Sequence, residues 1–229
     1  MNTVMFDTYN SFEHLGLVLS AKRIGAPAPK LLSVDIPCGD GELDYTGYFG
    51  RVNYYNRELS FDFTVAGEPR EYLNAYSRLQ NLLNGRKMKI TLSDDPLFYY
   101  VGRVSVDEWK SEKNIGKVTV KVNAEPYKLK HAKTVIYHTI DKETYITCNN
   151  LRKPVIPKIT LTTDGAKADI YVVKHSSVGE TRDLIARGVT GVCPNGTVFE
   201  EGENIIVVTP TAGATLPIGV RIEYQEGGL

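Results

Sequence analysis

Apolar and polar side chains alternate along most of this chain, which is the pattern of β-strands that bury one face. The clearest alternation runs through residues 59–65, where a leucine, two phenylalanines and a valine are separated by polar residues. Three valines alternate in the same way within residues 116–124. Looser versions of the pattern predict further strands over residues 16–24, 30–37, 87–93 and 98–109.

One segment follows a helical period instead. Over residues 69–84, one helical stripe collects the apolar side chains Tyr72, Leu73, Tyr76, Leu79, Leu82 and Leu83. Pro69 suits the first turn, Glu71 lies near the positive end of the helix dipole, and Gly85 is placed to end the helix. We therefore expect one amphipathic helix among strands.

The second half of the chain has a different texture. A mixed polar stretch over residues 131–150 leads, past two prolines, to short strand-like segments joined by glycine-containing turns. These segments cover residues 158–163, 169–175, 204–210 and 220–224, while residues 181–188 are an ambiguous helical candidate. The pattern is typical of a small β-sandwich. We predict a mainly β protein with two domains, residues 1–130 and 131–229.

Composition narrows the functional classes. The 229 residues include 27 basic and 27 acidic side chains, so net charge gives no argument for a nucleic-acid or anionic-membrane partner. Cys38, Cys148 and Cys193 are far apart and lack a CxxC spacing, which argues against a disulfide framework or a zinc site. Residues 1–16 lack the pattern of a secretion signal, and no apolar run approaches the length of a membrane span. We expect synthesis in a reducing cytoplasm and no membrane partner.

Motifs that carry catalytic chemistry are missing from the sequence. The four histidines show no metal-ligand spacing, and there is no GxSxG nucleophile motif. Asp94 and Asp95 lie in the turn at residues 93–96, where adjacent carboxylates usually splay apart into solvent. We therefore expect no catalytic residues, no metal and no cofactor, and a protein that is not an enzyme.

The segment CGDGELDYTG, residues 38–47, combines three acidic residues with three glycines. An EF-hand that begins at Asp40 would need glycine where Tyr45 stands and a closing glutamate where Arg51 stands. A phosphate loop would need a lysine directly after a glycine, and none is there. The remaining interpretation is a turn in which Gly39 and Gly41 take positive φ angles.

Several motifs occur in a fixed order before residue 130. They are IPxGDGELDYT from residue 36, YxNREL from residue 54, NGRKxKI from residue 84, DDPxFYYxGR from residue 94 and AEPY from residue 124. As an ordered set they resemble the distal tail protein family of phages with long, non-contractile tails and of related prophages. Residues 131–229, with PVIPKITL, EEGENIIVVTP and GVRIEY, resemble the galectin-like β-sandwich that this family carries behind its ring domain.

This resemblance implies a virion structural protein. Residues 1–130 would be a β-sandwich or barrel-like domain that builds a homohexameric hub ring, alone or as two stacked rings, with the second domain projecting outward. The ring would join the tail-tube protein to the tail-tip protein or baseplate, with a receptor-binding protein as a further candidate partner. DNA would pass through its channel without specific binding, past neutral or acidic residues. The protein would be made in the bacterial host cytoplasm and end at the virion tail tip.

In such a ring, the glycine-rich hairpin can reach a neighbouring subunit. The residues expected at that interface are Asp40, Glu42, Asp44, Tyr45, Tyr48, Phe49, Tyr54 and Tyr55. Large aromatic side chains are favoured at interfaces. The alternative is that these aromatic residues cover their own sheet.

A second function remains open: a carbohydrate-binding adhesion module that recognises host cell-wall glycan through its C-terminal sandwich. Aromatic rings that stack on sugars would have to come from residues such as Tyr171, Phe199 and Tyr224, since no tryptophan follows Trp109. The second domain also lacks the set of His, Asn, Arg and Trp through which galectins hold sugar.

Overall fold

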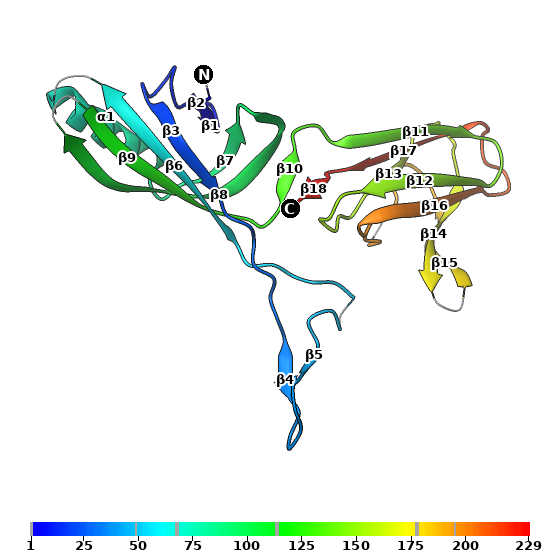
Figure 1. Ribbon diagram of the computed structural model, residues 1–229. Helices are drawn as coiled ribbons and strands as arrows, with labels where there is room; N and C mark the ends of the chain where they lie inside the picture. Colours follow the sequence, from blue (N-terminus) through cyan, green and yellow to red (C-terminus); the bar gives the residue numbers. More distant parts are fainter. Residues whose placement is uncertain (1, 49, 67–68, 113–114, 177–178, 195) are drawn as a thin grey trace. The chain divides into compact units, whose positions relative to one another are not determined.

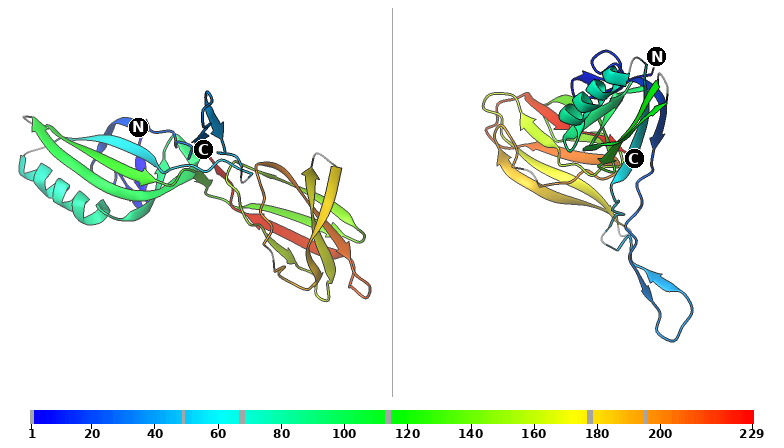
Figure 2. Two further views of the ribbon diagram at one scale, coloured as in Figure 1. Left: turned by 90° about the horizontal axis from the view of Figure 1, so that it is seen from below. Right: turned by 90° about the vertical axis from the view of Figure 1, so that its left-hand side faces the viewer.

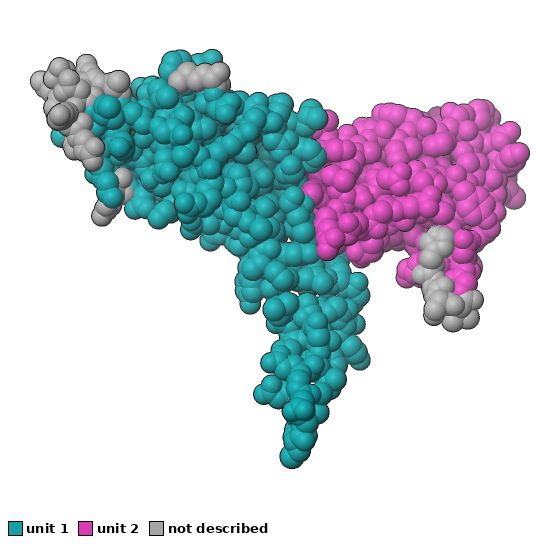
Figure 3. Space-filling view, viewed as in Figure 1, with its two compact units in different colours: residues 1–128, 229 teal, residues 129–228 magenta. Residues whose placement is uncertain are grey.

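A computed structural model describes residues 2–48, 50–66, 69–112, 115–176, 179–194 and 196–229. The chain divides into two compact units (Figure 3), unit 1 with residues 1–128 and Leu229, and unit 2 with residues 129–228. Both are built mainly of antiparallel strands (Figure 1). No helix in the described ranges is long and apolar enough to cross a membrane.

Unit 1 contains one continuous curved sheet (Figure 1). Its strands follow the order β2-β1-β7-β8-β9-β6-β3, and every neighbouring pair is antiparallel. Their bounds are β1 Val4–Phe6, β2 Tyr9–Asn10, β3 Val18–Ile24, β6 Arg57–Ala66, β7 Lys87–Leu92, β8 Asp95–Glu112 and β9 Ile115–Ala124. The two segments with the clearest alternation became β6 and β9, which pair along their full length.

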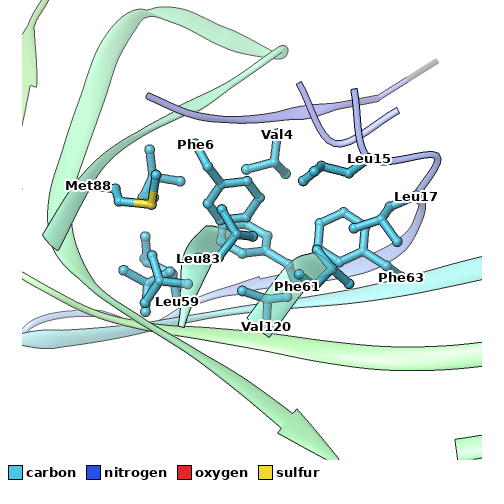
Figure 4. Packing of buried hydrophobic residues seen from close by; sticks show 14 of the residues in the cluster. Val4, Phe6, Leu15, Leu17, Leu59, Phe61, Phe63, Leu83, Met88 and Val120 are labelled. Atoms are coloured by element: carbon cyan, nitrogen blue, oxygen red, sulfur yellow. The ribbon is translucent and has the colours of Figure 1, made fainter. Parts of the chain in front are cut away.

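The inner face of this sheet holds the core of unit 1 (Figure 4). Phe6, Phe61 and Phe63 form its centre, with the rings of Phe6 and Phe61 edge to face at 6.2 Å between centroids. The helix α1, Pro69–Leu83, packs against β8 and β9 and buries Leu79 and Leu83 in this core. Side chains that the sequence alternation places outward on β6 are exposed or half-buried.

The helical stripe was predicted correctly at its C-terminal end. Tyr76 and Leu82 pack against the core beside the two buried leucines. Leu73, expected on the same stripe, is instead exposed. The Tyr72 side chain lies outside the described residues. Gly85 has a φ of 75°, as expected for the residue that ends the helix.

Unit 2 is a β-sandwich of two facing sheets. A three-stranded sheet has the order β11-β17-β13, with β11 Thr134–Ile140, β17 Ile218–Tyr224 and β13 Lys158–Leu161. A four-stranded sheet has the order β12-β16-β14-β15, with β12 Thr144–Asn150, β16 Gly202–Pro210, β14 Ala168–Ser176 and β15 Gly179–Val189. Ile146 and Ile206 from one sheet meet Ile159 and Ile222 from the other in the core. Short β10, Lys128–Lys130, pairs with β18, Gly227–Gly228.

Two features of unit 2 differ from the sequence analysis. Residues 131–150 were taken as a mixed polar stretch, whereas they hold β11 and β12. Residues 181–188 were an ambiguous helical candidate and belong to strand β15. β15 is an edge strand of its sheet and is exposed over most of its length, so its sequence shows little of the alternation that marks a strand with one buried face.

A long excursion leaves the sheet of unit 1 between β3 and β6 (Figures 1 and 2). We call residues 26–56 the arm. Its outer part is a two-stranded hairpin of β4, Ser33–Asp35, and β5, Glu42–Asp44. The hairpin pairs with no other strand of the described chain.

Candidate subunit interface

The arm is held together mainly by backbone hydrogen bonds. β4 and β5 pair antiparallel, with Val34 opposite Leu43. Beyond this short ladder, the Tyr45 amide donates to the Leu32 carbonyl at 2.7 Å. Nearer the sheet, the Tyr55 amide donates to the Ala28 carbonyl at 2.8 Å. An isolated two-stranded hairpin is at best marginally stable in water, so this arm needs further contacts to be rigid.

The tip of the arm is the tight turn expected from the sequence, with one correction. Gly41 has a φ of 84°, as predicted. Gly39 does not adopt a positive φ; the other left-handed residue of the turn is Cys38, with a φ of 60°. A Cβ on Gly39 would lie 2.8 Å from Cγ2 of Ile36, so the glycine is needed here to leave room for the Ile36 side chain.

Apolar side chains of the arm face solvent. In most proteins a cluster of large exposed apolar residues marks an interaction surface. The residues concerned are Leu31, Leu32, Val34, Leu43, Tyr45, Tyr48 and Tyr55, with exposed fractions from 37% to 74%. Figure 3 shows the arm as a slender projection of unit 1, which leaves these side chains with little of their own unit to pack against.

The five aromatic residues expected at an interface fall into different environments. Tyr48 and Tyr55 are 73% and 58% exposed, whereas Tyr54 is half-buried and packs edge to face on Tyr127. Tyr45 and Tyr48 contact each other with ring centroids 5.8 Å apart. Phe49 lies outside the described residues. The structure brings Tyr45 and Tyr48 together on the arm but places Tyr54 at its base.

The acidic residues of the tip are exposed, and none makes an ion pair within the described parts of the chain. Asp40 and Glu42 flank Gly41 at the turn. Asp44 accepts a hydrogen bond from the Thr46 amide at 2.8 Å, and the hydrogen bonds from Thr46 lower the pKa of the Asp44 carboxyl. With Asp35, these residues give the segment 33–47 four negative charges and no positive one.

The base of the arm is fixed by a buried arginine that the sequence analysis missed. Arg57 Nε donates to the Gly25 carbonyl at 2.7 Å, and Nη1 donates to the Pro126 carbonyl at 3.2 Å. Burial lowers the pKa of the Arg57 guanidinium, and the nearby Tyr100 opposes this effect. Because the two carbonyls lie on different segments, Arg57 ties the start of the arm to the end of β9.

With the exception of Cys38, the other residues considered for chemistry lie apart from the arm tip. Asp94 pairs with Lys22 and Asp95 pairs with Lys128, so the two carboxylates of the turn serve different ion pairs. No group of three potential metal ligands gathers among the described residues. All three cysteines are free thiols; Cys38 is exposed, while Cys148 and Cys193 are buried.

Two of the three aromatic residues considered for sugar stacking are core residues. Phe199 and Tyr224 are buried and pack edge to face at 5.3 Å between centroids. The Tyr224 hydroxyl donates to the Asn149 carbonyl at 2.6 Å. Tyr171 is half-buried in β14. Exposed Tyr145 has the Arg182 guanidinium over its ring at 5.0 Å, so this ring face is already occupied.

We compared the chain with protein families, curated proteins and solved structures. No protein-family model and no curated protein matches the chain. The crystal structure of SPP1 Dit (gp 19.1), described as a paradigm of the hub adsorption apparatus in phages that infect Gram-positive bacteria, aligns over 100% of both chains with a TM-score of 0.70 and 16% identity. The chain has the fold of a phage distal tail protein.

Other structures align less well. Two structures of the phage P2 baseplate in its activated conformation, one with Ca and one with Sr, cover 99% of this chain and 98% of theirs. Their TM-scores are 0.31 and 0.34 at 8% and 6% identity, so they carry no argument here. The distal tail protein likeness expected from the ordered motifs is confirmed at the level of the fold. The galectin-like character of unit 2 stays a prediction.

Proposed function

We propose that this chain is a structural protein of a phage tail tip, where copies of it form a hexameric hub ring between the tail tube and the tip or baseplate. The observation that carries the proposal is the full-length likeness to SPP1 Dit, which is itself described as part of a hub adsorption apparatus. The protein acts as a connector and has no catalytic role.

The arm gives this proposal a physical basis. Its exposed leucines and tyrosines gain stability when a neighbouring copy covers them, since burial of apolar surface contributes roughly 25 cal/mol per Å². A contact in which the arm of one copy meets a different surface of the next is heterologous. Heterologous contacts close into a ring when the rotation between copies permits. The interface residues of this proposal are the acidic and aromatic residues of segment 40–55 named above.

The proposed hub role also implies the other partners of the protein. Unit 1 builds the ring, as one ring or as two stacked rings, and unit 2 projects outward, where a receptor-binding protein is a further candidate partner. One face of the ring receives the tail-tube protein and the other the tail-tip protein. DNA passes through the channel without specific binding. The protein is made in the host cytoplasm and works at the virion tail tip.

The test is the solution mass of the purified chain over a concentration series, measured by light scattering after size exclusion, with negative-stain imaging of the largest species. A hexamer or dodecamer that shows rings with a central hole supports the proposal. A monomer at every concentration contradicts it. Deletion of residues 39–47 should shift the mass toward monomer, and unchanged rings would remove the arm tip from the interface.

A matched pair of variants tests the apolar part of the arm. Val34→Ser with Leu43→Ser removes a cross-strand pair that is exposed in the single chain, so monomer stability should change little while ring formation weakens. Tyr137→Ser with Ile156→Ser removes two exposed apolar residues of unit 2 and serves as the control. If the control weakens the ring as much as the arm variant does, the arm has no special role.

Glycan binding by unit 2 is the competing function. Of the three aromatic candidates, only Tyr171 lies outside the core of the sandwich. Binding to a glycan array that is lost in Tyr171→Ala would favour this function. Rings together with a blank array would favour the hub.

A further inference from the structure

A hollow on the outer face of the unit 1 sheet carries a cross-strand pair of cations. Lys87 on β7 lies directly opposite Arg103 on β8. Like charges directly opposite each other across two strands destabilise a sheet. Both side chains line a hollow of about 430 Å³, together with Asn56, Ser105, Asn123 and Glu125. We call this the basic hollow.

The charge of the basic hollow is only partly balanced within unit 1. Lys87 pairs with Glu125 at 2.7 Å, while Arg103 donates to the Gly85 carbonyl and has no carboxylate partner among the described residues. Lys89 follows Lys87 on the same exposed face of β7. Two further carboxylates belong to neighbouring residues: Glu58 lies opposite Asn123, and Asp7 accepts a hydrogen bond from the Lys89 amide at 2.8 Å. An anionic group from outside would offset the charge of Arg103.

A second hollow on the same sheet provides a comparison. It has about 420 Å³ and also contains a cross-strand pair of cations, Lys110 opposite Lys117. Two carboxylates, Asp62 and Asp107, line it as well, so its charged lining is balanced. The basic hollow, with two cations and one carboxylate in its lining, is the one that favours an acidic occupant.

The arm tip has the complementary chemistry. Asp40 and Glu42 lie at the turn, are exposed, and have no ion-pair partner in the described ranges. Arginine and carboxylate form short, directional, charge-assisted hydrogen bonds. The exposed apolar residues along the arm would lie against whatever surface flanks the hollow.

The acidic tip does not contact the basic hollow of its own chain. The base of the arm lies beside this hollow, because Asn56, the last residue of the arm, lines the hollow. Cys38 lies thirteen residues beyond Gly25, so an extended chain could place it at most about 45 Å away. Figures 1 and 2 show that the arm points away from its own sheet. Within one molecule the acidic tip and the basic hollow are therefore apart, whereas the tip of one copy is free to contact the hollow of another copy.

We infer that the acidic tip of one copy docks in the basic hollow of the next copy, which joins the chains head to tail. This inference rests on the proposed ring and names the surface that receives the arm. Each copy then supplies one tip and one hollow, which is the arrangement that a closed cyclic assembly requires.

Charge reversal tests the contact directly. The tip variant carries Asp40→Lys and Glu42→Lys, and the hollow variant carries Lys87→Glu and Arg103→Glu. Each alone would set like charges against each other, and we expect the concentration for half-assembly to rise about tenfold or more. An equimolar mixture should form rings again, because copies that alternate around a six-membered ring meet only complementary charges. Circular dichroism of each variant establishes that the chain is folded.

The control reverses the comparison pair, with Lys110→Glu and Lys117→Glu, and should assemble as the wild type does. If the wild type forms rings and the hollow variant forms them equally well, the inference fails and the hub proposal stands. If both variants fail alone and their mixture also fails, or if the control fails as badly, direct docking is refuted. A wild type that never assembles refutes the hub and this contact together.

Discussion

Gly116 lies under the only tryptophan of the chain, and replacing it gives a sharp test of the unit 1 core. A Cβ on Gly116 would lie 2.2 Å from Cζ2, 2.9 Å from Cη2 and 3.1 Å from Cε2 of Trp109. Carbon atoms in contact are usually about 3.5–4.0 Å apart. In Gly116→Ala the Trp109 indole must therefore shift by about 1 Å, which disturbs its contact with Tyr76, whose ring centroid lies 5.4 Å from that of Trp109.

The magnitude follows from two opposing effects. Extra carbon in a packed site typically costs about 1–3 kcal/mol. Gly116 does not have a positive φ, so alanine also restricts the unfolded chain, which recovers about 0.4–1 kcal/mol. Because Trp109 is half-buried and can shift outward, we expect Gly116→Ala to lower the free energy of unfolding by about 1–2 kcal/mol.

Urea unfolding followed by circular dichroism measures this loss, and tryptophan emission reports the displaced indole. Gly47→Ala is the matched control, since nothing lies within 4 Å of a Cβ there, and it should stay within about 0.5 kcal/mol of the wild type. A double-mutant cycle assigns the cause: in a Trp109→Leu background the clash is absent, so Gly116→Ala should be neutral or should stabilise by up to about 1 kcal/mol. A full cost in that background, or unchanged stability and emission in the single variant, would refute the packing argument.

Three further predictions concern buried polar groups. Arg57→Met leaves two backbone carbonyls without their donor and should cost about 2–4 kcal/mol in urea unfolding, with cleavage in the arm by a dilute protease increased. In the native protein, a thiol reagent at pH 8 should modify only Cys38, because Cys148 and Cys193 are buried and burial raises the pKa of Cys148 to about 12; Cys38→Ser should abolish the fast reaction, and fast reaction of either buried thiol would contradict this. Burial likewise raises the pKa of Tyr224 to about 12 from 10.0, so its stabilising contribution is complete below pH 10 and is lost as the pH rises toward 12; the stability difference between wild type and Tyr224→Phe should therefore shrink between pH 8 and pH 11.5, and a constant difference would be the contrary result.

Much of the fold could be predicted from the sequence where one face of an element is buried. Alternation identified β6 and β9, and the helical stripe located α1 within one residue of its end. Strands that are exposed on both faces carry no such signal, which is why β15 read as an ambiguous helix. β11 is an edge strand with several exposed residues, and its segment read as polar for the same reason.

The candidate site was predictable only in part. The residues of the tip excluded calcium and phosphate chemistry because those sites need particular side chains at fixed spacings. The left-handed Cys38 was not foreseen, since residues other than glycine seldom adopt a positive φ. The basic hollow was missed because Lys87 and Arg103 meet only through the register of β7 and β8. Sequence alone does not fix that register.

The arm exposes large apolar side chains and gathers carboxylates without a cation, and both features favour a contact with another copy. A single chain gains nothing from leucines placed on a thin hairpin that its own core cannot cover, nor from four carboxylates gathered without a cation. The same chain keeps an arginine and a lysine directly opposed on a sheet, which also costs stability in isolation. In the proposed contact, the charges of the two surfaces would offset each other between copies.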